Sequence, residues 1–135
     1  ITFAEAGTYE FQFHTEDGGS SVYLSELTRP RAYFTNPLVV NGAEDLAASG
    51  AASLTKPTSY FSTAAAETAT LAAGTEGQVK VFAMYADSGD MVITVTNPAW
   101  GGSGTITFSA VGQACTLQYI NSKWFCIGNN GAAFA

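Results

Sequence analysis

The sequence predicts an all-β protein, built as an antiparallel β-sandwich or as a barrel-like variant of one. Apolar and polar residues alternate along short segments, which is typical of half-buried strands. Gly, Asn, Asp and Pro residues separate these segments at short intervals, as turns do. The 135 residues fit one domain, and no apolar stretch approaches the about 20 residues that cross a bilayer. A chain of this length buries roughly two thirds of its unfolded surface, so it can fold without a disulfide scaffold.

The N-terminal part predicts a hairpin followed by irregular chain. Apolar and polar side chains alternate along residues 7–14, and residues 22–27 supply a partner strand after the turn at residues 17–19. Residues 36–62 contain repeated Pro and Gly breaks, which predict a loop with one short helical turn. For residues 64–67 a helix and a short strand are equally favoured, because alanine prefers helix and the threonines nearby prefer strand.

Five strands are predicted after residue 77, namely residues 78–85, 91–96, 105–111, 114–120 and 124–127. One face of these strands carries the predicted core, which comprises Met91, Ile93, Val95, Ile106, Phe108, Cys115, Leu117 and Tyr119. The opposite faces carry uncharged β-forming or polar residues, which are Thr94, Thr96, Thr105, Thr107, Ser109, Thr116 and Gln118. We therefore divide the chain into an N-terminal hairpin and irregular docking region, residues 1–62, and a C-terminal antiparallel module, residues 63–135, within one compact domain.

Charge is scarce in this chain. Charged residues make up 12% of the sequence, against roughly 25% in an ordinary domain. From Met91 to Ala135 the only charged side chain is Lys123. The net charge of -6 argues against nucleic acid or an anionic membrane surface as a partner. A neutral surface can be buried against another protein at small cost, because burying charge is the expensive step, so we expect self-association or docking on a larger assembly.

The two cysteines are expected to be free, core-type thiols. Cys115 and Cys126 are too few for a disulfide scaffold or a four-ligand zinc site. If residues 119–120 pair back onto residues 124–125, the two cysteines are offset across the hairpin, so no simple cross-strand disulfide is expected. We expect no metal ion and no cofactor.

Other candidate sites have simpler structural interpretations. His14 is the single histidine and lacks a nucleophile elbow or a ligand cluster around it, so we expect no enzyme activity. Residues 87–90, Asp-Ser-Gly-Asp, predict a hairpin turn, with a cation loop as the alternative. Trp100 lies in a turn, where its ring either packs or stacks on a sugar or partner. Arg29 and Arg31 form either a solvated connector or a docking contact with an acidic patch on a coat protein.

Three segments together resemble a module of bacteriophage structural proteins. They are the Gly-Thr-Glu-Gly-Gln turn at residues 74–78, the Thr-Ile-Thr-Phe strand at residues 105–108 and the Tyr-Ile-Asn-x-Lys-Trp hairpin at residues 119–124. The similarity covers about residues 68–135. Such modules are associated most with marine phages that infect cyanobacteria and related hosts, in capsid decoration proteins, head fibres and tail fibres.

This resemblance implies a virion structural protein that assembles as a trimer and carries no active site. The expected function is a decoration or cement subunit that stabilises the shell of a tailed phage. The alternative is a head- or tail-fibre domain that binds a host surface glycan. The expected partners are further copies of the chain and the major capsid protein, at the virion surface after assembly in the host cytoplasm. The expected interface residues are Trp124, Tyr119, Thr107, Thr116 and Trp100, and for Trp124 a place in the core is the alternative. The expected coat-docking residues are Arg29 and Arg31.

Overall fold

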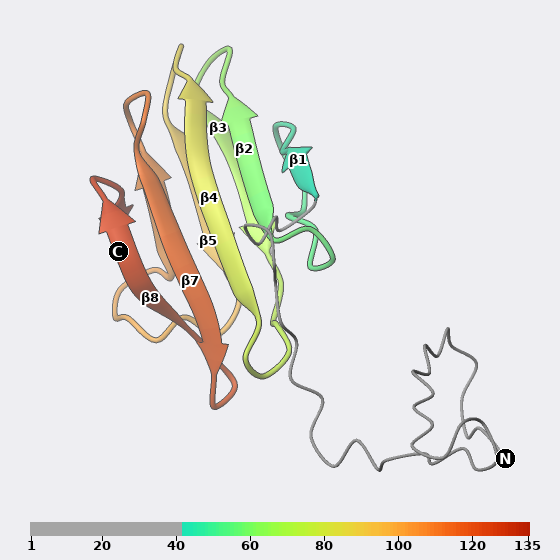
Figure 1. Ribbon diagram of the computed structural model, residues 1–135. Coiled ribbons are helices and arrows are strands. Elements are labelled where there is room, and N and C mark those ends of the chain that lie inside the picture. The colour runs from blue at the N-terminus through green and yellow to red at the C-terminus, as the bar shows by residue number, and fades with distance from the viewer. Residues whose placement is uncertain (1–41) are drawn as a thin grey trace, which may run out of the picture. The chain divides into compact units, whose positions relative to one another are not determined.

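The computed structural model describes residues 42–135, which form two packed β-sheets (Figure 1). The strands are β1 (Ala43–Asp45), β2 (Thr58–Ser62), β3 (Glu67–Leu71), β4 (Val79–Ala86), β5 (Met91–Val95), β6 (Thr105–Phe108), β7 (Ala114–Ile120), β8 (Lys123–Asn130) and β9 (Ala133–Phe134). Among these residues no helix has the length and apolar character needed to span a membrane. The all-β prediction is confirmed.

The two sheets form a sandwich, not a closed barrel. One sheet has five strands in the order β1-β2-β4-β7-β8, and the other has four in the order β3-β5-β6-β9. Their inner faces meet in one apolar core, where the ring of Phe61 on β2 packs edge-on against that of Phe108 on β6 at a centroid distance of 5.0 Å. Both rings are fully buried.

The prediction of an antiparallel fold holds for only part of the sandwich, because both sheets are mixed. The pairs β1/β2, β2/β4 and β3/β5 are parallel, whereas β4/β7, β5/β6, β6/β9 and β7/β8 are antiparallel. The parallel pairs β2/β4 and β3/β5 arise because the chain alternates between the sheets from β2 to β5. Strand β3 in one sheet therefore separates β2 from β4 in the other, and β2 and β4 run in the same direction. Local sequence patterns do not reveal such a crossover.

The predicted core is confirmed. The side chains of all eight predicted core residues are buried, at 6% exposure or less. They occupy alternate positions along β5, β6 and β7, as the period of two requires. Leu71, Phe82, Met84 and Trp124 complete this core from β3, β4 and β8.

Residues 87–90 form a turn, but the predicted hairpin is wrong. The turn carries the chain from β4 in one sheet to β5 in the other, and the chain between β2 and β3 makes a similar crossing. These two arches contact each other, since Ser88 N donates to Thr63 O at 3.1 Å and Glu67 N donates to Asp90 O at 2.8 Å. Gly89 fits this contact because a Cβ there would lie 2.3 Å from the backbone of Ala65.

The predicted hairpin before the C-terminus is confirmed. Tyr119 pairs with Trp124 across a tight turn in which Asn121 and Ser122 both have positive φ angles, 47° and 63°. Two left-handed residues give a turn twist that matches the flanking strands. The cysteines are offset as expected, because Leu117, not Cys115, opposes Cys126. Both thiols are free, but Cys126 is exposed, so it is not a core thiol as predicted.

The prediction of irregular chain for residues 36–62 is wrong for two segments. Strands β1 and β2 lie within this range and join the five-stranded sheet beside β4. A helix and a short strand are equally favoured by the sequence for residues 64–67. Residues 64–66 form neither of them, and β3 begins at Glu67. The predicted hairpin at residues 7–27, His14, Arg29 and Arg31 lie outside the described residues.

Candidate interaction surface

The outer face of the five-stranded sheet is the most distinctive surface of the described residues. Large apolar side chains on β2, β4, β7 and β8 project from it into solvent: Tyr60, Val79, Tyr85, Ile120 and Phe125. Tyr85 is 73% exposed, and Ile127, at the bulge of edge strand β8, is 55% exposed. No comparable large apolar side chain is exposed on the strands of the four-stranded sheet.

Strand register makes this surface continuous. Val79 on β4 lies beside Gln118 on β7, which in turn lies beside Phe125 on β8. Because directly opposed residues share a face, these three side chains form one row across the sheet. Nearer β2, the rings of Tyr60 and Tyr85 meet at a centroid distance of 6.2 Å.

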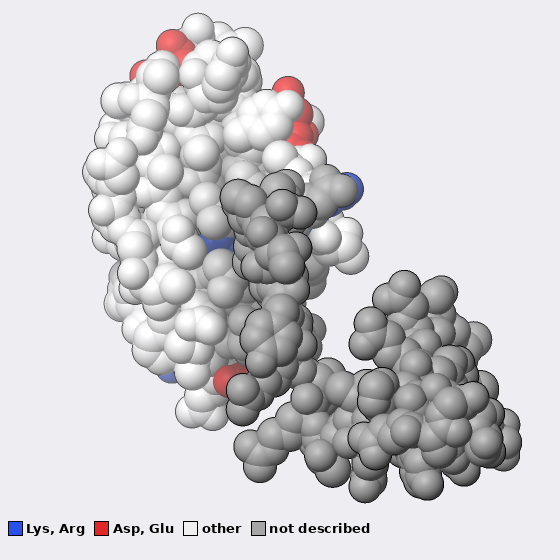
Figure 2. All heavy atoms as spheres, in the orientation of Figure 1, with Lys and Arg blue, Asp and Glu red and all other residues white. Residues whose placement is uncertain are grey.

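The surface carries no charge over its three central strands. The outward positions of β2, β4 and β7 hold only apolar, hydroxyl and amide side chains. The nearest charges flank it, with Asp45 opposite Tyr60 on edge strand β1 and Lys123 opposite Ile120. Figure 2 shows this side of the molecule as largely uncoloured, with acidic atoms near its ends. The described part of the chain therefore presents a neutral, partly apolar surface.

The outer face of the four-stranded sheet is neutral in a different way. Its outward residues are mostly threonines, namely Thr68, Thr70, Thr94, Thr105 and Thr107. Threonine is a good strand former, and its hydroxyl remains compatible with water. This face explains the low charge of the sequence without exposing large apolar side chains.

The five expected interface residues do not form one surface. Thr116 lies on the outer face of the five-stranded sheet, opposite Val81, whereas Thr107 lies on the four-stranded sheet. Trp124 and Tyr119 are buried in the core, at 0% and 6% exposure. Their rings meet edge to face at 5.0 Å, and Trp124 Nε1–H donates to the carbonyl of Ala72 at 2.9 Å. These two rings therefore stabilise the domain from within.

Trp100 lies in the loop between β5 and β6 and is half-buried. Its ring packs edge-on against Phe134 of β9, with the ring centroids 4.9 Å apart. Among the described residues its buried Nε1–H has no hydrogen-bond partner. This contact holds the loop against β9, so the ring is not presented as a free stacking platform.

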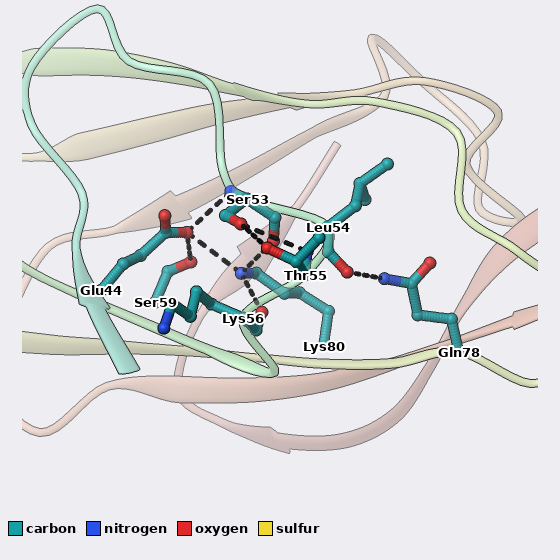
Figure 3. Close-up of polar contacts among 8 residues, drawn as sticks. All are labelled: Glu44, Ser53, Leu54, Thr55, Lys56, Ser59, Gln78 and Lys80. Carbon is teal, nitrogen blue, oxygen red and sulfur yellow. Dashed lines mark hydrogen bonds and ion pairs between the residues drawn. The ribbon is translucent and has the colours of Figure 1, made fainter. Parts of the chain in front are cut away.

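A buried ion pair lies near edge strand β1 of the five-stranded sheet (Figure 3). The side chain of Lys80 on β4 points inward and is fully buried. Its Nζ donates to Glu44 Oε1 at 3.1 Å and to the carbonyl oxygens of Ser53 and Lys56, each at 2.8 Å. A lysine ammonium has three donors, and here each of them has an acceptor.

Glu44 on β1 is the counter-ion of this pair. Its Oε1 also accepts hydrogen bonds from Ser59 Oγ and from Ser53 N. Burial alone would raise the pKa of Glu44, but these hydrogen bonds and Lys80 outweigh it, and the pKa is lowered from its ordinary value. For Lys80, burial lowers the pKa more than Glu44 raises it.

This ion pair was not predicted, although one signal was present. Residues 79–85 alternate, so Lys80 shares a face with the buried Phe82 and Met84. Its partner Glu44 is 36 positions away and belongs to a segment predicted as loop. With every donor satisfied, the cluster fastens β1 and the loop before β2 to β4. Its role is therefore structural.

The thiol of Cys115 is not a nucleophile in this environment. It lines a shallow hollow over β7 and β8 whose other residues are Ala114, Thr116, Gly128, Asn129 and Asn130. Burial, with a smaller contribution from Cys126, raises the pKa of Cys115 to about 12. The thiolate, which is the reactive form, is therefore negligible at neutral pH.

No protein-family model matches the sequence, and no curated protein matches it.

Proposed function

We propose that this chain is a structural subunit of a virion, a decoration or cement protein on the surface of a tailed bacteriophage. The observation that carries the proposal is a β-sandwich whose outer faces are uncharged over β2, β4 and β7 of one sheet and over β3, β5 and β6 of the other, and whose last third has one charged side chain. Such faces suit repeated protein contacts, because little charge has to leave water when they are buried. The similarity of residues 68–135 to phage structural modules supports the same function.

In this proposal the subunit stabilises the shell by burying surface against neighbouring proteins, and it catalyses no reaction. It assembles as a trimer, a number that comes from the phage resemblance, and it clamps neighbouring copies of the major capsid protein. Arg29 and Arg31 supply a contact with an acidic patch of the coat, since arginine forms planar, two-point pairs with carboxylates.

Localisation on intact particles tests the proposal. Antibodies against the chain should label the shell of purified virions by immunogold electron microscopy, and quantitative mass spectrometry should count hundreds of copies per particle. Tens of copies at one vertex would instead favour a fibre domain that recognises a host glycan. Absence of the chain from purified particles would overturn both the decoration function and the fibre function.

A further inference from the structure

We infer that residues 43–57 form an acid-released strap, which seals one side of the sandwich while Glu44 is ionised and opens locally when Glu44 is protonated. The strap consists of β1 and the loop that leads to β2. The inference does not depend on the proposed function, because it is argued from the contacts of the strap alone.

The strap covers an edge of each sheet. Its first part, β1, lies parallel beside β2 and forms the edge of the five-stranded sheet. Its middle part crosses to edge strand β3 of the other sheet, where Ser49 N donates to Thr68 O at 2.6 Å and Ala52 N donates to Thr70 O at 2.8 Å. An unpaired strand edge is a template for other strands. The closed strap therefore occupies the backbone groups of two edges at once.

One side chain holds the strap to the sheet. Lys80 lies on β4 and is fully buried. All three hydrogen-bond acceptors of its Nζ belong to the strap, namely the carboxylate of Glu44 and the carbonyl oxygens of Ser53 and Lys56 (Figure 3). The position of the strap therefore depends on a buried ammonium and its single counter-ion.

Apolar contacts add little to this attachment. Of the side chains in the strap, only those of Leu46 and Ala52 are buried in the core. Strand β1 has three residues, and its pairing with β2 is parallel, which is slightly less stable per residue than antiparallel pairing. The state of the ion pair is therefore expected to decide whether the strap stays closed.

Acid removes the charge that balances Lys80. Within residues 42–135, Glu44 is the one charged group that faces Lys80, and the other charged side chains of the strap, Asp45 and Lys56, are exposed. Burial raises the pKa of Glu44, but hydrogen bonds from Ser59 of β2 and from a backbone N–H of the strap, together with Lys80, lower it below its ordinary value of 4.5. The closed strap is therefore stabilised above pH 4.5, and this stabilisation is lost as the pH falls through the lowered pKa. The ammonium is then buried without a counter-charge, which strongly favours opening.

Hydrogen exchange of the full chain tests this opening. Protection factors are measured against the rate of an unstructured peptide at each pH, so that the chemical effect of pH on exchange cancels. Between about pH 7 and about pH 3.5, the amides of Leu46, Ser49 and Ala52 should lose at least about tenfold more protection than those of β5 and β7. These two strands lie inside the sheets and report unfolding of the whole domain. Equal losses in the strap and in β5 and β7 would overturn the inference.

Two matched variants on β1 identify the trigger. Glu44→Gln resembles the protonated side chain, so the protection of the strap at pH 7 should fall by at least about thirtyfold and should then no longer respond to acid. Asp45→Asn removes the neighbouring, exposed carboxylate and should keep the response of the wild type. An acid response in Glu44→Gln equal to that of the wild type would overturn the inference, and so would identical behaviour of the two variants.

A double variant keeps the test possible if Glu44→Gln alone does not fold. Adding Lys80→Met to Glu44→Gln removes the unpaired buried charge, so the strap should close again at pH 7, with protection within about tenfold of the wild type. Its protection should stay constant down to about pH 3.5, because neither member of the ion pair remains. An acid response of the strap that persists in the double variant would show that another group drives the opening, and would overturn the inference.

Discussion

Trp124 joins three segments of the chain through one side chain. Its Nε1–H bonds to Ala72, its ring packs on Tyr119, and Gly74 fits against the ring because a Cβ there would lie 2.6 Å from Trp124 Cζ2. We predict that Trp124→Ala lowers the free energy of unfolding by about 3 to 5 kcal/mol, through the cavity that it leaves. Urea denaturation followed by circular dichroism measures this loss.

The neighbouring residue is the matched control. Phe125 is 41% exposed on the outer face, so Phe125→Ala should cost less than about 1 kcal/mol in the monomer. Equal losses for the two variants would contradict the core position of Trp124.

The ion pair of Lys80 and Glu44 predicts a loss of stability in acid. Because the pKa of Glu44 is lower in the folded chain than its ordinary value of 4.5, the folded state gains stability above that value. This gain is lost as the pH falls through 4.5 toward the lowered pKa, and Lys80 is then left buried without a counter-charge. Thermal melts between pH 7 and pH 3 should show this step, and Glu44→Gln should flatten it.

A double-mutant cycle isolates the pair from its surroundings. We predict that Glu44→Gln costs about 2 to 4 kcal/mol at pH 7, slightly below the range for fully buried pairs, because 21% of the Glu44 side chain is exposed. Adding Lys80→Met removes the buried ammonium, so the double variant should lose less than the sum of the single losses. Additive losses would show that the two groups act independently.

Among the elements, the arches between the sheets give the sharpest prediction. Gly89→Ala brings a Cβ within 2.3 to 2.7 Å of backbone atoms of Ala65 and Ala66, which cannot move without displacing the neighbouring arch. We predict a loss of about 1 to 3 kcal/mol in urea denaturation. Gly101→Ala is the control, because its Cβ would meet nothing within 4 Å and its φ angle is not positive. If both glycines tolerate alanine equally, the arches are not in contact.

Individual strands could be predicted from the sequence, but their partners could not. The alternation in β5 and β7 identified buried residues such as Ile93 and Leu117, because a period of two depends only on neighbours in the chain. Pairing depends on distant segments: Thr58 lies beside Val81, with β3 between them in the chain. The same limit concealed the contact of Lys80 with Glu44. It also left Thr107 and Thr116 grouped together, although they lie on different sheets.

For the whole molecule, the lack of charge on the outer face predicts how assembly responds to salt. Contacts between opposite charges weaken when salt screens them. In the proposed assembly the copies meet through neutral side chains, while each chain carries a net charge of -6 that repels its neighbours. We predict that the dissociation constant falls or stays constant between about 50 mM and 1 M sodium chloride. Sedimentation velocity across this series measures it, and a rising constant would point to a charged contact.

The alternation of the chain between sheets also determines how the domain folds. Among pairs of strands that follow each other in the chain, only β5/β6 and β7/β8 are antiparallel, whereas β1/β2 is parallel, so only these two hairpins can form early by local closure. Parallel neighbours β2 and β4 meet only after β3 has crossed to the other sheet, which closes a loop and costs chain entropy before core contacts repay it. Topologies with such distant pairings fold in milliseconds to seconds. During synthesis, the inner faces of β2 and β4 therefore stay partly uncovered until β6 of the opposite sheet has emerged, and the edge of β4 stays unpaired until β7 has emerged. This interval is when the chain is most exposed to aggregation.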